Sequence, residues 1–230
     1  MADTGADVKS AGGAARQRKY DPAATRANIV AVATREFAEN GLSGARIDEI
    51  AAKTKTSKRM IYYYFGDKER LYRHVLEVAY SRVRAGEAAL RLDHLPPVEA
   101  LRTLVGFTFD HHDANPDFVR LVMIENIHHG AYLKESDIIE SLNAGAIVHI
   151  DRIYRAGTEA GVFRPGLKPL EIHWLISSLA FFNVSNRATF SRIFGWRGGK
   201  AGERARLRKQ VVETVLRFVL TPAATEEYCG

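Results

Sequence analysis

Apolar side chains recur every three or four positions along most of the chain, which is the spacing of amphipathic helices. The first helix should begin at Asp21-Pro22, where an N-cap residue precedes a proline, and end at Asn40-Gly41. No stretch alternates as a strand would, and there is no internal repeat. We therefore predict an all-α fold of about nine helices, near residues 22–40, 47–51, 58–64, 68–92, 97–114, 117–129, 135–160, 168–194 and 203–220.

Two of these helices, near 47–51 and 58–64, are short, separated by a tight turn, and preceded by a longer one. That order is typical of a helix-turn-helix unit. We expect its small core to consist of Ile29, Ala33, Phe37, Ile47, Ile50, Ala51, Ile61 and Phe65. The chain then divides into a disordered arm (1–20), the helix-turn-helix domain (21–68), a connecting helix (69–92), a larger helical body (93–222) and a tail (223–230).

The positive charge of the chain is concentrated near its N-terminus. The net charge is +6, and thirteen basic and seven acidic residues lie between Arg16 and Arg73, so this segment carries the whole excess. A basic segment attached to a neutral body suggests a polyanionic partner such as DNA. On charge alone, a merely solubilising surface is about equally plausible. The arm ends in a basic cluster, and contact with DNA and an inert tail are likewise both open for it.

The segment from Ser57 to Phe65 has the chemistry of a helix that enters the major groove. If Ile61 and Phe65 face the core, the outward side chains are two cations and a run of tyrosines, namely Lys58, Arg59, Tyr62, Tyr63 and Tyr64. Cations can bind guanine edges or phosphates, and tyrosine hydroxyls can donate to phosphates. Three consecutive tyrosines span too wide an arc of a helix to be buried together in so small a domain. Ser57 at the N-cap adds an anion site at the helix N-terminus.

These residues resemble the tetracycline-repressor (TetR) family of bacterial regulators. The family pattern is met by Ile50-Ala51, by Ser57, by the run from Ile61 to Phe65, and by Lys68-Glu69-Arg70-Leu71. The preceding Phe37-Ala38-Glu39-Asn40-Gly41 is similar to the usual end of the first helix in the family. The resemblance covers about residues 22–75. It implies a dimeric, ligand-responsive regulator, expected to be a repressor that binds a palindromic operator and is released by a small organic effector.

The resemblance also implies roles for individual residues. Lys58, Arg59 and Tyr63 become candidates for contacts to base edges, and Ser57, Tyr62, Tyr64 and Lys68 for contacts to the DNA backbone. Two positions depart from the family pattern. Ala45-Arg46 lacks the usual hydroxyl cap of the second helix, so we expect Arg46 to contact phosphate instead. Thr54-Lys55-Thr56 lacks the usual glycine, so Lys55 should adopt the left-handed conformation at a cost of about 1 kcal/mol.

For the body, the resemblance implies a ligand-binding and dimerisation domain from about residue 93. The last two long helices have wide apolar faces, which fit either a four-helix dimer interface or an intrachain core. These faces contain Leu170, Trp174, Leu175, Leu179 and Phe182, and then Leu207, Val211, Val215, Leu216 and Val219. A pocket for a small, partly apolar effector is expected between the helices near 100–128 and 140–185. Its candidate residues, for which core packing is the alternative, are Phe107, Phe109, Met123, His128, Phe181 and Asn186.

A metal-dependent helical-bundle enzyme is the alternative class. His111-His112 and His128-His129 lie near carboxylates, but adjacent histidines on a helix point about 100° apart. The Glu-x-x-His spacing occurs once, at Glu125 and His128, whereas a di-iron bundle needs it twice. We therefore expect no catalytic activity, no metal and no cofactor. No stretch approaches a membrane span, and the single cysteine excludes an internal disulfide, so we expect the protein in the cytoplasm.

Overall fold

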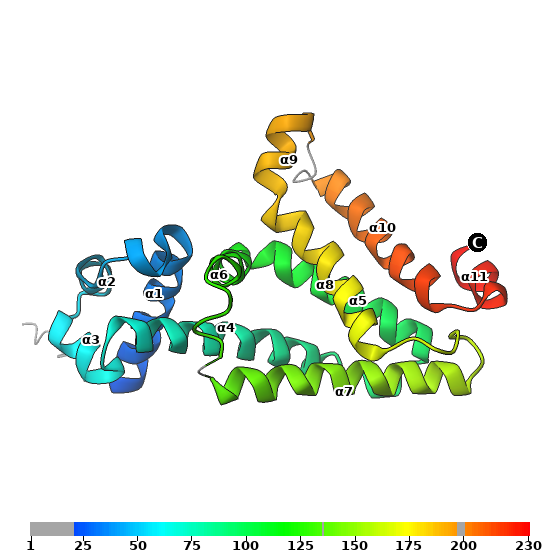
Figure 1. Cartoon of the computed structure of the whole chain (residues 1–230), viewed down its shortest axis with the longest axis horizontal. Helices are drawn as coiled ribbons and strands as arrows, with labels where there is room; N and C mark the ends of the chain where they lie inside the picture. Colours follow the sequence, from blue (N-terminus) through cyan, green and yellow to red (C-terminus); the bar gives the residue numbers. More distant parts are fainter. Residues whose placement is uncertain (1–20, 135, 197–200) are drawn as a thin grey trace, which may run out of the picture.

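The computed structural model describes residues 21–134, 136–196 and 201–230 (Figure 1). Within them the chain forms eleven α-helices and one 3₁₀ helix, with no strand beyond an isolated bridge between Phe163 and Leu220. The all-α prediction is confirmed. The basic arm, residues 1–20, lies outside the described residues. No helix in the described part is long and apolar enough to cross a membrane.

The first three helices form a compact unit, which we call the head: α1 (Pro22–Gly44), α2 (Ile47–Thr54) and α3 (Lys58–Phe65). As predicted, Asp21 caps α1, with its carboxylate accepting from the N–H groups of Ala23 and Ala24 at 3.0 and 3.1 Å. The predicted stop at Gly41 is a kink, where φ is +67°, and helical turns continue to Gly44. All eight residues expected in the head core are buried in one cluster.

The turn between α2 and α3 closes without a glycine, as predicted. Lys55 is left-handed, with φ 54° and ψ 34°, and its N–H donates to the carbonyl of Ala52 at 3.3 Å. Arg46 occupies the N-cap position of α2 and makes no side-chain cap bond. Ser57 caps α3, with Oγ accepting from the Met60 N–H at 3.3 Å. Local sequence signals therefore determine this turn and the beginning of α3.

The remaining helices begin with α4 (Lys68–Ala89), which runs from the head into the body, where it packs against α7 (Figure 1). The body consists of the helices that follow it. They are η1 (Leu92–His94), α5 (Pro97–Ala114), α6 (Pro116–Ile127), α7 (Asp137–Glu159), α8 (Pro169–Ser185), α9 (Arg187–Phe194), α10 (Ala201–Val219) and α11 (Pro222–Cys229).

The helix count of about nine was too low, for two reasons. The single helix expected at 168–194 is broken at Asn186 into α8 and α9. Asn186 donates its N–H to the carbonyl of Phe182 at 3.2 Å, and its own carbonyl accepts from Phe190 at 2.9 Å, so it caps both helices. No glycine or proline marks this break in the sequence. The supposed tail is helix α11, which begins with Thr221-Pro222, the same kind of start signal as Asp21-Pro22.

The molecule has two apolar cores. The head core continues beyond α3 into α4, α6 and α7, through Leu71, Tyr72, Leu121 and Ile139. The second core lies between α5, α7, α8, α10 and α11 in the body. Because α4 and α6 take part in the head core and also run into the body, the head is held by two helices that continue beyond it.

Candidate functional site

Helix α3 presents a polar and aromatic face to solvent. Ile61 and Phe65 are buried beneath it, while 45% of Tyr62 and 77% of Tyr63 is exposed. Arg59 is exposed and Tyr64 is half-buried. The prediction that the three tyrosines cannot all be buried is confirmed. The exposed rings of Tyr62 and Tyr63 leave apolar surface in water and their hydroxyls can donate, so this surface suits a partner that covers the rings and accepts hydrogen bonds.

A surface hollow of about 570 Å³ lies against this face, between α3 and the beginning of α1. It is lined by Pro22, Arg59, Met60, Tyr63 and Tyr64. The rings of Tyr63 and Tyr64 meet edge to face, with centroids 5.5 Å apart. The structure therefore brings together three of the predicted DNA-contacting residues, Arg59, Tyr63 and Tyr64, in one concave surface.

Two of the predicted contacts are engaged within the head. Lys58 forms an ion pair with Asp48 of α2. The ammonium of Lys68 donates to the carbonyl of Ser43, near the end of α1, at 3.4 Å. Arg46 is exposed at the beginning of α2. Lys58 therefore holds α3 against α2, and Lys68 holds α4 against α1, so a DNA partner would have to compete for Lys58.

A buried carboxylate that sequence reasoning missed holds the head together. Glu36 is 4% exposed and accepts from the Lys53 ammonium at 2.7 Å, the Asn40 amide at 3.1 Å and the Arg46 N–H at 3.4 Å. Burial acts to raise the pKa of Glu36, but the bonds from Lys53 and Arg46 outweigh it, so the pKa lies below its usual value. The sequence did contain a signal for this buried carboxylate, because Glu36 lies on the apolar face of α1 next to Phe37.

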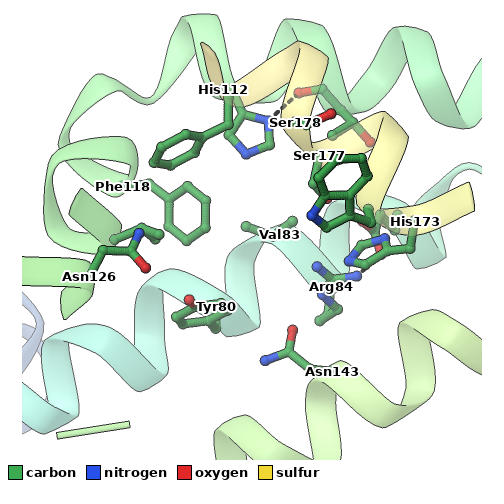
Figure 2. A pocket seen from close by; sticks show the side chains of 15 residues that line it. Tyr80, Val83, Arg84, His112, Phe118, Asn126, Asn143, His173, Ser177 and Ser178 are labelled. Carbon is green, nitrogen blue, oxygen red and sulfur yellow. Dashed lines mark hydrogen bonds and ion pairs between the residues drawn. The ribbon is translucent and has the colours of Figure 1, made fainter. Parts of the chain in front are cut away.

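A cavity of about 510 Å³, here called the central cavity, lies between α4, α5, α6, α7 and α8. Figure 2 shows Arg84 beside His173 on one side of it, and Phe118 with Asn126 on the other. Its walls combine aromatic rings with imidazoles, amides and hydroxyls. The polar and aromatic lining residues are Tyr80, Arg84, Glu87, Thr108, His112, Phe118, Asn126, Asn143, His173, Trp174, Ser177, Ser178 and Phe181.

The ionisable groups of the central cavity are largely neutralised. Arg84 and Glu87 form an ion pair at 2.6 Å, and burial raises the pKa of Glu87. Burial, helped by the nearby charge of Arg84, lowers the pKa of His173 to about 4 and also lowers that of His112. Nδ1 of His112 donates to the carbonyl of Thr108 at 2.7 Å, which leaves Nε2 as an acceptor. The cavity therefore offers hydrogen bonds with little net charge.

The predicted pocket residues do not converge on one place. Phe181 lines the central cavity, whereas Asn186 lines a separate hollow between α8, α9 and α10. Phe109 is fully buried in the body core, the alternative foreseen for it. Phe107 packs on Gly86 and on the His111 ring. Met123 and His128 are exposed.

The lining residues that were missed are mostly polar and lie on five helices far apart in sequence. Periodicity therefore could not assemble them.

The histidine doublets do not form a metal site in the described part of the chain, where no group of three or more potential ligands is close enough to hold an ion. The rings of His111 and His112 both pack against Phe118, with centroids 5.9 Å and 5.7 Å away respectively, so these histidines take part in an aromatic cluster. Glu125 is 1% exposed and accepts from the Tyr72 hydroxyl at 2.9 Å and the Tyr132 N–H at 3.3 Å. It joins α6 to α4.

The predicted apolar faces of α8 and α10 lie in different environments. Val211, Val215, Leu216 and Val219 of α10 are buried within the body core, so the intrachain alternative holds for them. On α8, Leu170, Trp174 and Phe182 are 63%, 70% and 52% exposed. Spaced by four and eight residues, these three lie toward one exposed side of α8, where Trp174 also borders the central cavity.

An exposed basic and aromatic recognition helix, joined by long helices to a body with a cavity, defines a helix-turn-helix DNA-binding regulator. Two family models match the chain: "Bacterial regulatory proteins, tetR family" at residues 29–75 and "Tetracyclin repressor-like, C-terminal domain" at residues 97–215. The chain belongs to the TetR family of bacterial regulators, as the sequence resemblance suggested, and is a DNA-binding transcriptional repressor.

Similar proteins and solved structures agree with this family assignment. The chain is 40% identical to the transcriptional repressor NicS of Pseudomonas putida, over 73% of this chain and 79% of the relative. It is 31% identical to the repressor SCO4008 of Streptomyces coelicolor, over 71% and 80%. The crystal structure of the putative regulator SCO4942 from Streptomyces coelicolor matches with a TM-score of 0.65 and 28% identity, over 85% of this chain and 98% of that one.

Proposed function

We propose that the protein is a homodimeric repressor that places α3 of each subunit in the major groove of a palindromic operator and leaves it when a small organic effector binds the body. The observation that carries the proposal is the face of α3, where Arg59, Tyr62 and Tyr63 are exposed over a buried Ile61 and Phe65. A single head offers few base contacts, and two heads double them and fix the half-site spacing.

The surroundings of each residue support a division of roles. Arg59 and Tyr63 share the hollow on α3 and would reach base edges, together with Lys58 once it leaves Asp48. Phosphate contacts would come from the residues around the rim. These are Arg46, Ser57, Tyr62, Tyr64 and Lys68. Of them, Lys68 would have to exchange its bond to the Ser43 carbonyl for a phosphate oxygen.

The exposed side of α8 supports dimerisation through α8 and α10. Large apolar side chains exposed side by side are typical of an interface between subunits. In this arrangement α8 contributes Leu170, Trp174 and Phe182, and α10 contributes its exposed polar face, because its apolar face is already buried. The dimer would then be held mainly by α8.

The central cavity supports an effector that is small and partly apolar, with hydrogen-bonding groups that match imidazoles and amides. Two helices connect the cavity to the head. Helix α4 carries Tyr80, Arg84 and Glu87 in the cavity wall and follows α3 directly, while α6 carries Phe118 and Asn126 and packs into the head core through Leu121. If the effector binds more tightly to a conformation in which α4 and α6 are shifted, its binding changes the spacing of the two heads. The dimer then no longer fits the operator and is released.

The protein would act by binding alone, without a cofactor, in the bacterial cytoplasm where its DNA partner lies.

The test begins with an operator selected from random duplex DNA by the purified full-length protein. Arg59→Ala should weaken operator binding about tenfold or more, and should reduce the dependence of affinity on salt by about one phosphate contact if Arg59 binds phosphate rather than a base.

The matched control is Arg155→Ala, which removes an exposed arginine from α7 in the body. We expect this variant to bind the operator as the unaltered protein does. Equal operator affinity for the Arg59 and Arg155 variants, with both still folded, would refute the assignment of α3 as the recognition helix.

A further inference from the structure

The chain enters the head next to the recognition helix. The surface hollow that holds Arg59 and Tyr63 of α3 is also lined by Pro22, the first residue of α1. In Figure 1 the beginning of α1 lies beside α3. The segment that precedes Pro22 in sequence, the basic arm of residues 1–20, therefore joins the head at the edge of the surface that we propose to face DNA.

Two contacts fix this point of entry. The carboxylate of Asp21 accepts from the N–H groups of Ala23 and Ala24, which holds the residue before Pro22 at the N-cap. One turn later, the guanidinium of Arg26 lies over the ring of Phe65 at the end of α3, 5.4 Å from its centroid. The place where the arm meets the head is therefore determined by α1 and α3 together.

The positive charge of the arm is concentrated at the end that joins the head. Arg16, Arg18 and Lys19 lie within four consecutive positions, and residues 8–20 include no acidic residue. The excess of six positive charges between Arg16 and Arg73 falls to three when these residues are left out. An inert tail does not require its cations at this end, whereas a polyanion beside α3 attracts them there. Half of the excess charge of the chain therefore lies within reach of the proposed DNA surface.

The length of chain suits the groove next to the one that α3 enters. Arg16 precedes Asp21 by five residues, and such a segment spans at most about 17 Å. The major groove is about 12 Å wide, so the basic cluster can cross one sugar–phosphate strand and reach the adjacent minor groove. A narrow minor groove attracts arginine, and the amide of Gln17 can donate to the acceptors of A·T pairs there. Residues 11–15 are all alanine or glycine, which are small enough for a groove about 6 Å wide.

We infer that the basic arm of each subunit lies in the minor groove beside the major groove that holds α3, with its cationic cluster between the two phosphate strands. The inference rests on the proposed docking of α3 and gives the protein a second element that reads DNA sequence. Because arginine favours a narrow minor groove, each half-site should be flanked by an A·T-rich segment. This preference is separate from the bases that α3 contacts.

The first test removes the charge of the arm in the full-length protein bound to its selected operator. A single variant combines Arg16→Gln, Arg18→Gln and Lys19→Gln. We expect its operator affinity to fall about tenfold or more at physiological salt, and the slope of affinity against salt to become shallower by about two to three per subunit. Replacing the A·T-rich flanks with G·C pairs should weaken binding of the unaltered protein about threefold to tenfold, and should have no effect on this variant.

The matched control combines Arg152→Gln, Arg155→Gln and Lys168→Gln. It also removes two arginines and one lysine, all of them exposed, but from the body. This variant should keep the operator affinity, the salt dependence and the flank preference of the unaltered protein.

The second test locates the arm in one groove. Cys229 is the single cysteine of the chain, so a Cys229→Ser background allows an iron–EDTA group to be attached at Arg18→Cys alone. Hydroxyl radicals released in the minor groove cleave the two DNA strands with a stagger opposite to that from the major groove. We expect the minor-groove stagger, immediately beside each half-site.

Three results would overturn the inference. The first is an arm variant with the operator affinity and salt dependence of the unaltered protein. The second is an equal loss of affinity in the control variant of the body, since the effect would then come from net charge alone. The third is cleavage with the major-groove stagger, or no cleavage beside the half-sites.

Failure of this inference differs from failure of the proposed function. If Arg59→Ala weakens operator binding while the arm variant binds normally, only the role of the arm is refuted. If Arg59→Ala binds normally, recognition by α3 is refuted whatever the arm variant does.

Discussion

The head and the body use aromatic and charged residues in opposite ways. In the head, Tyr62 and Tyr63 face solvent, and the excess positive charge of the chain lies in the sequence segment from Arg16 to Arg73 that includes them. In the body, Arg84 and Glu87 are paired at 2.6 Å, and the histidines of the central cavity are kept neutral by burial. Exposed charge suits the binding of a rigid polyanion such as DNA, whereas an enclosed surface with balanced charge suits the binding of a small molecule. The two regions therefore differ in what each loses when a side chain is removed.

The largest expected effect separates packing from recognition within the head. Phe37 is fully buried, and its ring meets the Tyr72 ring edge to face at 5.1 Å between centroids. Phe37→Ala should lower the free energy of unfolding by about 3–5 kcal/mol. Tyr63→Ala removes an aromatic ring of similar size that is 77% exposed, so unfolding should change by less than about 0.5 kcal/mol while operator binding weakens.

Urea unfolding at fixed protein concentration measures the first effect, and operator titration measures the second. A Tyr63 variant that unfolds as easily as the Phe37 variant would mean that the exposed ring supports the fold of the head. In that case the head would not divide into buried residues that support the fold and exposed residues that bind DNA.

The head was predictable from sequence because its information is local. The cap at Asp21, the left-handed Lys55 and the Ser57 cap each depend on a few neighbouring residues, and the apolar spacing gave the core. The central cavity depends on side chains from five helices, such as Arg84, His112 and His173, whose proximity only tertiary packing determines. The break at Asn186 was missed because an uninterrupted apolar stretch carries no local stop signal.

The neutral histidines of the body predict a loss of stability in mild acid. Burial lowers the pKa of His111 and His173 to about 4 in the folded protein, from about 6.5 in the unfolded chain. Below pH 6.5 the unfolded chain therefore binds protons first, and stability falls until the folded pKa near 4 is reached. Between pH 7.5 and pH 5, His173→Gln should reduce this loss of unfolding free energy by about 2 kcal/mol.

Urea unfolding of both proteins at the two pH values measures that difference. The matched control is His128→Gln, which alters an exposed histidine at the end of α6. Its loss of stability with acid should equal that of the unaltered protein. Equal pH dependence for the His173 variant and the unaltered protein would show that His173 is solvated in the folded state.

The smallest expected effect concerns the exposed ion pair between α2 and α3 of the head. Lys58, at the beginning of α3, is paired with Asp48 of α2, and both side chains are about half exposed. Exposed pairs contribute little to stability, about 0–1 kcal/mol. Asp48→Asn should leave unfolding nearly unchanged, yet it frees Lys58 and removes a negative charge near the DNA. Operator affinity should therefore rise about three- to tenfold, more at low salt than at high salt.

Two comparisons separate release of Lys58 from the general loss of an acidic charge. Glu49→Gln neutralises the neighbouring exposed carboxylate of α2, which is not paired with Lys58, and should raise affinity less. In a Lys58→Ala background, Asp48→Asn should lose most of its benefit, because no lysine remains to be released. If Asp48→Asn instead weakens operator binding, the pair must hold Lys58 in its binding position, and α3 would then be preorganised in the free protein as the neutral cavity is in the body.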